Sequence, residues 1–206
     1  MASAVDICNM ALANLGDVAD ITSLYPPEGS AQAERCAQFY PLAVKTLLES
    51  HDWGFATVRK QLVKYEVNSR DNWQYCYAVP ADCIKIIDLN DQPFTQLPPE
   101  FAKRHYDYEL GLNDNGQRCI YTNLEDAVMR YIANVSENQF PANFVMALSW
   151  KLSGMLAGPL LKGDSGAQMT MNCEKMYSYW MSNAIGIDAN QHREYRESVP
   201  SWITGR

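Results

Sequence analysis

Three histidines are the residues best suited to hold a metal ion or to move a proton. His51, His105 and His192 lie in unrelated regions of the chain. None has a second ligand at the spacing that places two side chains on one face of a helix. We therefore expect solvated histidines, no metal site and no bound cofactor.

Acidic residues could provide a second kind of chemistry, because glycoside hydrolysis needs two carboxylates that flank the scissile bond. Asp71 and the neighbouring Glu125 and Asp126 are available, but nothing in the sequence brings them together. Surface solvation is the expected role of these carboxylates.

An aromatic stripe, formed by Trp73, Tyr75 and Tyr77, could bind a ligand by stacking. Alternate residues of a strand share one face of a sheet, and such a face can stack on sugars or bases. Packing inside the protein or at a subunit interface is the commoner use of aromatic residues in this pattern. The stripe therefore favours packing over ligand binding.

Two glycine-containing loops match functional motifs only in part. Residues 111–116 read GLNDNG and offer oxygen ligands, but the distal glutamate of a calcium loop is missing, so we expect a plain turn. Residues 163–166 read GDSG and are expected to cap a helix, since neither a nucleophile turn nor a phosphate-binding loop occurs. The sequence thus predicts a protein that is not an enzyme.

Six cysteines are scattered singly through the chain, at positions 8, 36, 76, 83, 119 and 173. This spacing contains neither the pairs of a zinc site nor a redox Cys-x-x-Cys. We expect reduced cysteines that pack in the core, since a free thiol behaves as a small apolar side chain.

Charge and composition limit the possible partners. With 24 acidic and 17 basic residues the formal net charge is −7, the reverse of the balance that a binder of nucleic acid phosphates needs. The chain is 47% hydrophobic, which excludes disorder, and no run approaches the roughly 18 apolar residues of a membrane span. The N-terminus has no secretory pattern. We expect a protein that stays in the cytoplasm, without specific DNA binding and without a membrane.

The N-terminal region reads as two helices. The first is expected from Ser3 to Leu15, with a capping box at its start and Gly16 at its end. The second should begin after Ser30, a favoured N-cap residue, and run to Leu48. Pro41 either kinks this second helix or divides it into two shorter helices that meet near Phe39.

The middle of the chain, from Trp53 to Val135, changes to the period-two pattern of strands. Strands are expected at 57–65, 75–79, 84–89 and 129–135. Proline, glycine and asparagine interrupt the pattern often, which predicts short antiparallel strands joined by tight turns.

Two further helices follow. One begins at Pro141 and is expected to end at Gly158-Pro159. Phe144, Leu148 and Leu152 form an apolar face on it that should pack against other helices. The other should begin near Asp164 or Ser165 and end around Gly186. Residues 187–206 have too little periodicity for a helix and read as an extended tail.

The expected fold is therefore α+β. A helical bundle is predicted from residues 1–52 and 140–186, with a small antiparallel β domain of residues 53–139 inserted between them. The tail of residues 187–206 carries isolated anchors, Tyr195, Val199 and Trp202, which could dock on a partner or simply fray.

Several stretches, in the same order along the chain, resemble the tail tubular protein A family, the head-to-tail adaptors of short-tailed bacteriophages. The matching stretches are Ile7–Gly16, Ala33–Val44 leading to His51-Asp-Trp53, Tyr77–Cys83 and Phe140–Pro159. Residues 21–29 and 97–116 match no part of the family pattern, so the resemblance implies nothing about the loops there or their contacts.

The resemblance implies a structural protein of the virion, assembled in the host cytoplasm and located in the tail or neck. It implies a dodecameric ring held between the portal protein and the tail nozzle protein, with genomic DNA passing through the middle in non-specific contact. An acidic channel wall would repel the phosphate backbone and let DNA slide. In this family the C-terminal segment is thought to reach the portal, so Tyr195, Val199, Trp202 and Arg206 are the predicted portal-binding residues.

Two alternatives remain open. A virion-associated cell-wall hydrolase would use the aromatic stripe to bind glycan and an acidic pair to cut it. A neck or stopper protein of a long-tailed phage would use the same bundle, and the residues alone do not separate it from the adaptor.

Overall fold

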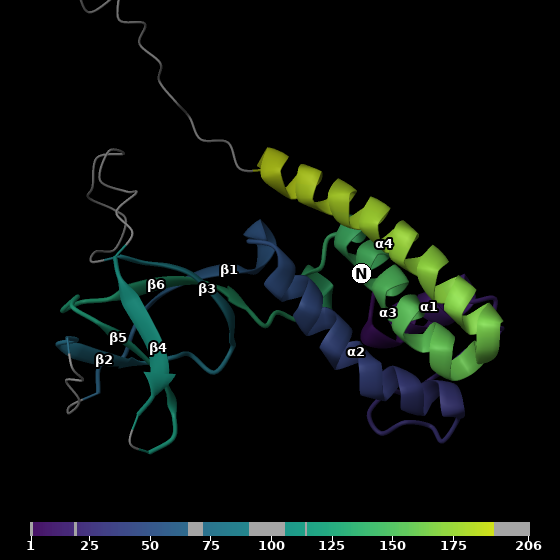
Figure 1. Cartoon of the computed structure of the whole chain (residues 1–206), viewed down its shortest axis with the longest axis horizontal. Helices are drawn as coiled ribbons and strands as arrows, with labels where there is room; N and C mark the ends of the chain where they lie inside the picture. The colour runs from purple at the N-terminus through teal and green to yellow at the C-terminus, as the bar shows by residue number, and fades with distance from the viewer. Residues whose placement is uncertain (1, 19, 66–71, 91–105, 114, 192–206) are drawn as a thin grey trace, which may run out of the picture.

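The protein is an α+β molecule in which a helical bundle lies beside a small β domain (Figure 1). The computed structural model describes residues 2–18, 20–65, 72–90, 106–113 and 115–191. Helices from both ends of the chain form the bundle, and the described strands lie between them in the sequence. The fold class predicted from the sequence is confirmed.

Helix α1 (Ala4–Asn14) begins at the predicted capping box. The Ser3 hydroxyl accepts a hydrogen bond from the Asp6 amide (3.1 Å), and the Asp6 carboxylate accepts one from the Ser3 amide (2.8 Å). Both bonds satisfy amide groups that the start of a helix leaves free. Gly16 turns the chain after the helix with a φ of 77°, a conformation that costs glycine little.

Helix α2 (Ala31–Ser50) is continuous and contains Pro41. The Ser30 hydroxyl caps it by accepting a hydrogen bond from the Ala33 amide (3.1 Å). The alternative of two helices meeting near Phe39 is wrong. The residues on both sides of the proline bury one common face, which holds Cys36, Tyr40, Ala43 and Leu47, while Pro41 itself is exposed.

Helix α3 (Ala142–Leu161) is the central helix and packs against α1 and α2. The predicted stop at Gly158-Pro159 is wrong, because the helix continues to Leu161. The chain reverses at Lys162 and Gly163, whose φ angles are 54° and 59°. A single proline near a helix end removes only one backbone hydrogen bond, so it does not force the helix to stop there.

Helix α4 (Gly163–Gln191) returns along α3. Gly166 allows the two helices to approach closely, since a Cβ there would lie 3.2 Å from the Ala157 carbonyl oxygen and 3.5 Å from the Gly158 Cα. The predicted end near Gly186 is wrong. Residues 187–191, expected to begin the extended tail, are still helical.

The β domain consists of two three-stranded antiparallel sheets, in the orders β1-β6-β3 and β2-β5-β4. The strands are β1 (Thr57–Gln61), β2 (Tyr75–Ala78), β3 (Cys83–Asn90), β4 (Tyr108–Leu112), β5 (Arg118–Thr122) and β6 (Val128–Ala133). The sequence pattern located four of these strands but did not identify β4 or β5. Within the described residues only β4 and β5 are sequence neighbours paired through a tight turn, so the expectation of tight turns throughout is wrong.

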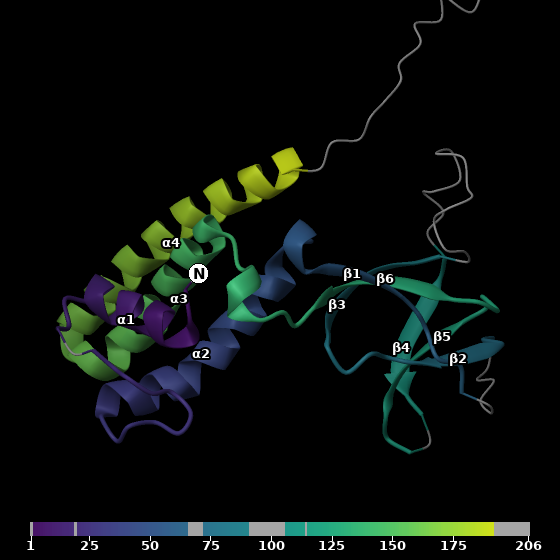
Figure 2. The ribbon, with the colours of Figure 1, turned by 180° about the vertical axis from the view of Figure 1, so that it is seen from behind.

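The two parts of the molecule share packing. Tyr77, Ile120, Leu89 and Met129 belong to a buried cluster within the β domain. Ile132 of β6 instead belongs to the core cluster of the bundle and is fully buried. Helix α2 runs from the bundle toward the β domain, where it contacts β3 (Figures 1 and 2). The β1-β6-β3 sheet is thereby fixed against the bundle.

Helix α3 is long and apolar enough to cross a membrane by length and composition, with a mean hydropathy of 1.4 over an 18-residue window. That exceeds what we expected from the sequence. However, 56% of the window is buried inside the protein, between the other helices of the bundle. The same apolarity is required of a helix that lies at the centre of a bundle.

Candidate binding cleft between the bundle and the β domain

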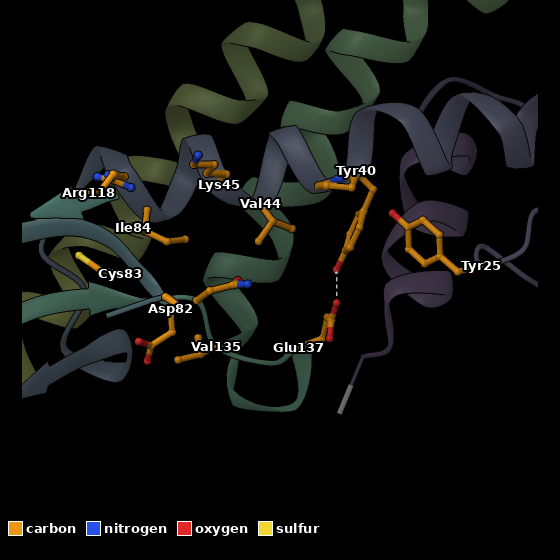
Figure 3. A pocket seen from close by; sticks show the side chains of 13 residues that line it. Tyr25, Tyr40, Val44, Lys45, Asp82, Cys83, Ile84, Arg118, Val135 and Glu137 are labelled. Carbon is orange, nitrogen blue, oxygen red and sulfur yellow. Dashed lines mark hydrogen bonds between the residues drawn. The ribbon is translucent and has the colours of Figure 1, made fainter. Parts of the chain in front are cut away.

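A cleft of about 500 Å³ lies where α2 faces the β domain (Figure 3). The lining comes from Tyr25, from residues 40–45 of α2, from residues 81–84, from Arg118 and from residues 134–137. These segments are far apart in the sequence. The cleft therefore exists only because the β domain is held against the bundle.

A hydrogen bond joins the two sides of the cleft at one end. The Tyr40 hydroxyl on α2 donates to the Glu137 carboxylate (3.2 Å), which belongs to the short helix η2 (Glu137–Gln139) before α3 (Figure 3). Burial and the adjacent Glu137 charge raise the pKa of Tyr40. The tyrosine therefore stays protonated and serves as a fixed donor.

Asp82 is held in a similar way at the other end. Both of its carboxylate oxygens accept from the Tyr131 hydroxyl at 3.1 Å, and its backbone carbonyl accepts from the Asn134 amide at 2.7 Å. Burial, together with the hydrogen bond to Asp82, raises the pKa of Tyr131 to about 12. The turn before β3 is thus fixed to β6.

Raising the pH should weaken the folded state through Tyr131. Its folded pKa of about 12 exceeds the ordinary value of 10, so the folded state holds this proton more tightly. The stabilisation is complete below pH 10 and is lost as the pH rises toward 12. In urea unfolding across this interval, the stability difference between wild type and Tyr131→Phe should shrink. Tyr179→Phe, which changes a 59% exposed tyrosine, is the control, and a constant difference for Tyr131→Phe would contradict the assignment.

Two cations, Lys45 on α2 and Arg118 at the start of β5, lie along one side of the cleft, opposite Asp82 and Glu137 (Figure 3). Both are exposed. Among the residues that the structure describes, neither cation has an ion-pair partner. Val44 and Ile84 add apolar surface beside them.

The chemistry of this arrangement is that of binding. Burial raises the pKa of the one thiol in the lining, Cys83, so that it remains a poor nucleophile. Asp82 and Glu137 already accept hydrogen bonds from the Tyr131 and Tyr40 hydroxyls, respectively. No group of three potential metal ligands occurs within the described ranges. The free cations and the apolar surface suit an acidic segment of a macromolecule.

Asp188 explains why helix α4 extends beyond its expected end. Its side chain is only 8% exposed and accepts from the Gly54 amide at 3.0 and 3.2 Å. His51 Nε2 lies 3.3 Å from one of its oxygens. The expectation that His51 is simply solvated is therefore wrong, because it borders a buried carboxylate that ties α4 to the entrance of the β domain.

Replacing Asp188 by alanine should lower the free energy of unfolding by about 1 to 3 kcal/mol, because the Gly54 amide loses its acceptor. Chemical denaturation measures the effect. Asp164→Ala, at an exposed position in the first turn of the same helix, should change stability by about 0.5 kcal/mol or less. Equal effects of the two substitutions would show that the carboxylate at 188 is not structural.

The six cysteines are all free and buried, as predicted. Cys8 on α1 and Cys36 on α2 form a pair in the bundle core. The hydrogen bond to Cys36 and burial raise the pKa of Cys8. Both side chains are fully buried, so both positions behave as packing residues.

The aromatic stripe does not form a ligand platform. Tyr77 is 1% exposed, and its hydroxyl donates to the carbonyls of Leu124 (2.7 Å) and Glu125. The Trp73 indole donates to Glu109 (2.9 Å), and its ring packs with a different buried cluster from that of Tyr77. Packing, the role favoured by the sequence pattern, is confirmed.

The two glycine-containing loops are structural, as expected. The Asn113 side-chain oxygen accepts from the amides of Asn115 (3.0 Å) and Gln117 (2.8 Å), which closes the β4–β5 turn. Residues 163–166 form the first turn of α4, where the Ser165 hydroxyl donates to the Lys162 carbonyl at 3.1 Å.

Several predicted residues lie outside the described part of the chain. These are Asp71, His105, His192 and the four portal-binding candidates Tyr195, Val199, Trp202 and Arg206. Glu125 and Asp126 lie on an exposed turn between β5 and β6, away from the cleft lining. Sequence reasoning missed the cleft, because its lining combines isolated residues whose proximity no local pattern encodes.

Comparison with known proteins adds no relative, since no family model and no curated protein matches the chain.

Proposed function

We propose that the protein is a structural component of a bacteriophage virion, a head-to-tail adaptor that joins the portal to the tail nozzle. The observation that carries this proposal is the order of elements. Both ends of the described chain contribute helices to one bundle, and a small β domain is inserted between them. That is the arrangement implied by the resemblance to the tail tubular protein A family.

The outward face of α4 supports association with other proteins. This helix of 29 residues has four charged residues, Asp164, Glu174, Lys175 and Asp188. Asp188 is buried, and Glu174 pairs with Lys151 of α3 at 3.0 Å. The large apolar side chains left exposed on α4 are Met171, Met176, Tyr179 and Ile187. Few charges combined with exposed methionine and tyrosine are typical of protein interfaces.

The proposed assembly is a dodecameric ring with the genome channel at its centre. A net charge of −7 on each subunit gives the ring an acidic character. An acidic channel wall repels the phosphate groups of DNA, so passing DNA is contacted without being retained. Strong salt-dependent binding of DNA to the isolated protein would argue against this role.

Portal binding is assigned to the residues after α4, with Tyr195, Val199, Trp202 and Arg206 as anchors. Because Asp188 is part of the folded bundle, a truncation that tests this assignment must keep Gln191. Removal of residues 192–206 should weaken portal binding by at least about tenfold, or about 1.4 kcal/mol. The free energy of unfolding should remain that of the full chain.

The test mixes the full-length protein with the portal protein of the same phage. Native mass spectrometry and negative-stain electron microscopy should show a ring of adaptor subunits on the portal. Trp202→Ala should reduce occupancy, while Ser201→Ala, its neighbour in the same segment, serves as the matched control. Absence of any portal complex, or turnover of peptidoglycan by the purified protein, would overturn the proposal.

A further inference from the structure

We propose that the cleft between α2 and the β domain receives the acidic turn of a second copy of this chain. The acidic turn is defined as residues 123–127, between β5 and β6. This inference rests on the proposed function in that it identifies one contact through which subunits of the ring associate. The two halves of the contact are complementary in charge.

Lys45 and Arg118 form the accepting side. Both lie on one wall of the cleft, are exposed, and have no ion-pair partner within the described ranges (Figure 3). The chain carries a net charge of −7, so the two cations give this wall of the cleft a charge opposite to that of the chain as a whole. Asp82 and Glu137 on the opposite wall would repel an acidic guest, so they orient it toward the cationic wall.

Glu125 and Asp126 form the inserting side. Both are exposed, and neither forms an ion pair within the described part of the chain. The turn that carries them is rigidly held: the buried Tyr77 hydroxyl donates to the Leu124 and Glu125 carbonyls, and the Leu62 amide donates to the Ala127 carbonyl at 2.9 Å. A turn that is already ordered loses little conformational entropy when it binds.

A subunit cannot fill its own cleft with this turn. Arg118 is the first residue of β5, and the acidic turn follows its last residue, Thr122. A strand rises about 3.3 Å per residue, so the two sites lie roughly 13 Å apart at opposite ends of β5. The contact must therefore be between copies. It joins different surfaces of the two subunits, which is the type of interface that generates rings when the rotation closes.

Charge exchange tests the contact. One variant combines Lys45→Glu with Arg118→Glu, and the other combines Glu125→Lys with Asp126→Lys. Each variant alone should associate with itself at least about tenfold more weakly than wild type, measured as the dissociation constant. Self-association of wild type should weaken with added salt. An equimolar mixture of the two variants should recover association, because each supplies the charge that the other lacks. Sedimentation velocity measures wild type, the two variants and their mixture, with and without portal protein.

Matched controls separate a specific contact from a change in net charge. Arg35→Glu with Lys162→Glu, and Asp20→Lys with Glu34→Lys, alter the same charges at exposed positions outside the cleft lining, the acidic turn and helix α4. These variants should associate like wild type. In a mixture of isotope-labelled and unlabelled wild-type protein, carbodiimide should link Lys45 of one copy to Glu125 or Asp126 of another.

Unchanged association of the cleft and turn variants, or a mixture that does not recover, would overturn the inference. Wild-type protein that remains monomeric with and without portal would overturn it as well. Failure of the proposed function has a different signature, because it is the absence of portal binding by wild type. Charge variants that still bind portal through residues 192–206 but no longer contact each other would support both proposals.

Discussion

Replacement of Trp53 by alanine is expected to lower the free energy of unfolding by about 3 to 5 kcal/mol. Trp53 is 1% exposed and lies between the end of α2 and the first strand. Its ring makes edge contacts with Phe144 (5.1 Å between ring centroids) and His51 (4.9 Å). Its indole donates to the Leu47 carbonyl at 2.8 Å. Alanine therefore leaves a large cavity and removes a buried hydrogen bond at the junction of the two parts.

Substitution by phenylalanine separates these two losses. Trp53→Phe removes the indole donor while retaining an aromatic ring, and should cost about 1 to 3 kcal/mol. Trp180→Phe is the matched control, because the buried Trp180 indole nitrogen has no hydrogen-bond partner among the described residues. Denaturant titrations should show a smaller loss for Trp180→Phe. A larger loss there would contradict the assigned role of the Trp53 hydrogen bond.

Leu148→Ala is the second substitution expected to have a large effect, about 2 to 5 kcal/mol. Leu148 is fully buried at the centre of the bundle, on the face of α3 that the sequence pattern identified as apolar. Removing its side chain leaves a cavity that the rigid surrounding helices fill only partly. Equilibrium denaturation and the midpoint of thermal unfolding both measure the change.

Leu42→Ala provides the control for this prediction. Leu42 is 55% exposed on α2, so its truncation should change the free energy of unfolding by about 0.5 kcal/mol or less. A loss at Leu148 well below 2 kcal/mol, or equal to that at Leu42, would mean that the wrong face of α3 has been assigned to the core.

The structural role of Asp188 affects how portal binding is tested. A truncation that begins at residue 187 removes Asp188 and destabilises the bundle, so lost binding could reflect unfolding. A truncation that begins at residue 192 keeps the whole of α4. Comparing the two distinguishes a docking segment from a structural one.

The sequence by itself determined the local features of this protein. Ser3 with Asp6, and Ser30 with Ala33, contact one another within one helical turn, so short spacing is enough to predict where α1 and α2 begin. The buried cysteines and the apolar face of α3 followed from composition and periodicity in the same way. The α+β class followed because helix and strand periods differ along the chain.

Only the tertiary structure decided which distant segments meet. β1 pairs with β6 although most of the β domain lies between them in the sequence, and no local signal in either strand specifies that partner. Asp188 extends α4 because it reaches Gly54, 134 residues away in the sequence. The Tyr40–Glu137 bond at the cleft spans 97 residues. Such contacts depend on packing of the whole chain rather than on neighbours, which is why the cleft could not be located until the bundle and the β domain were placed together.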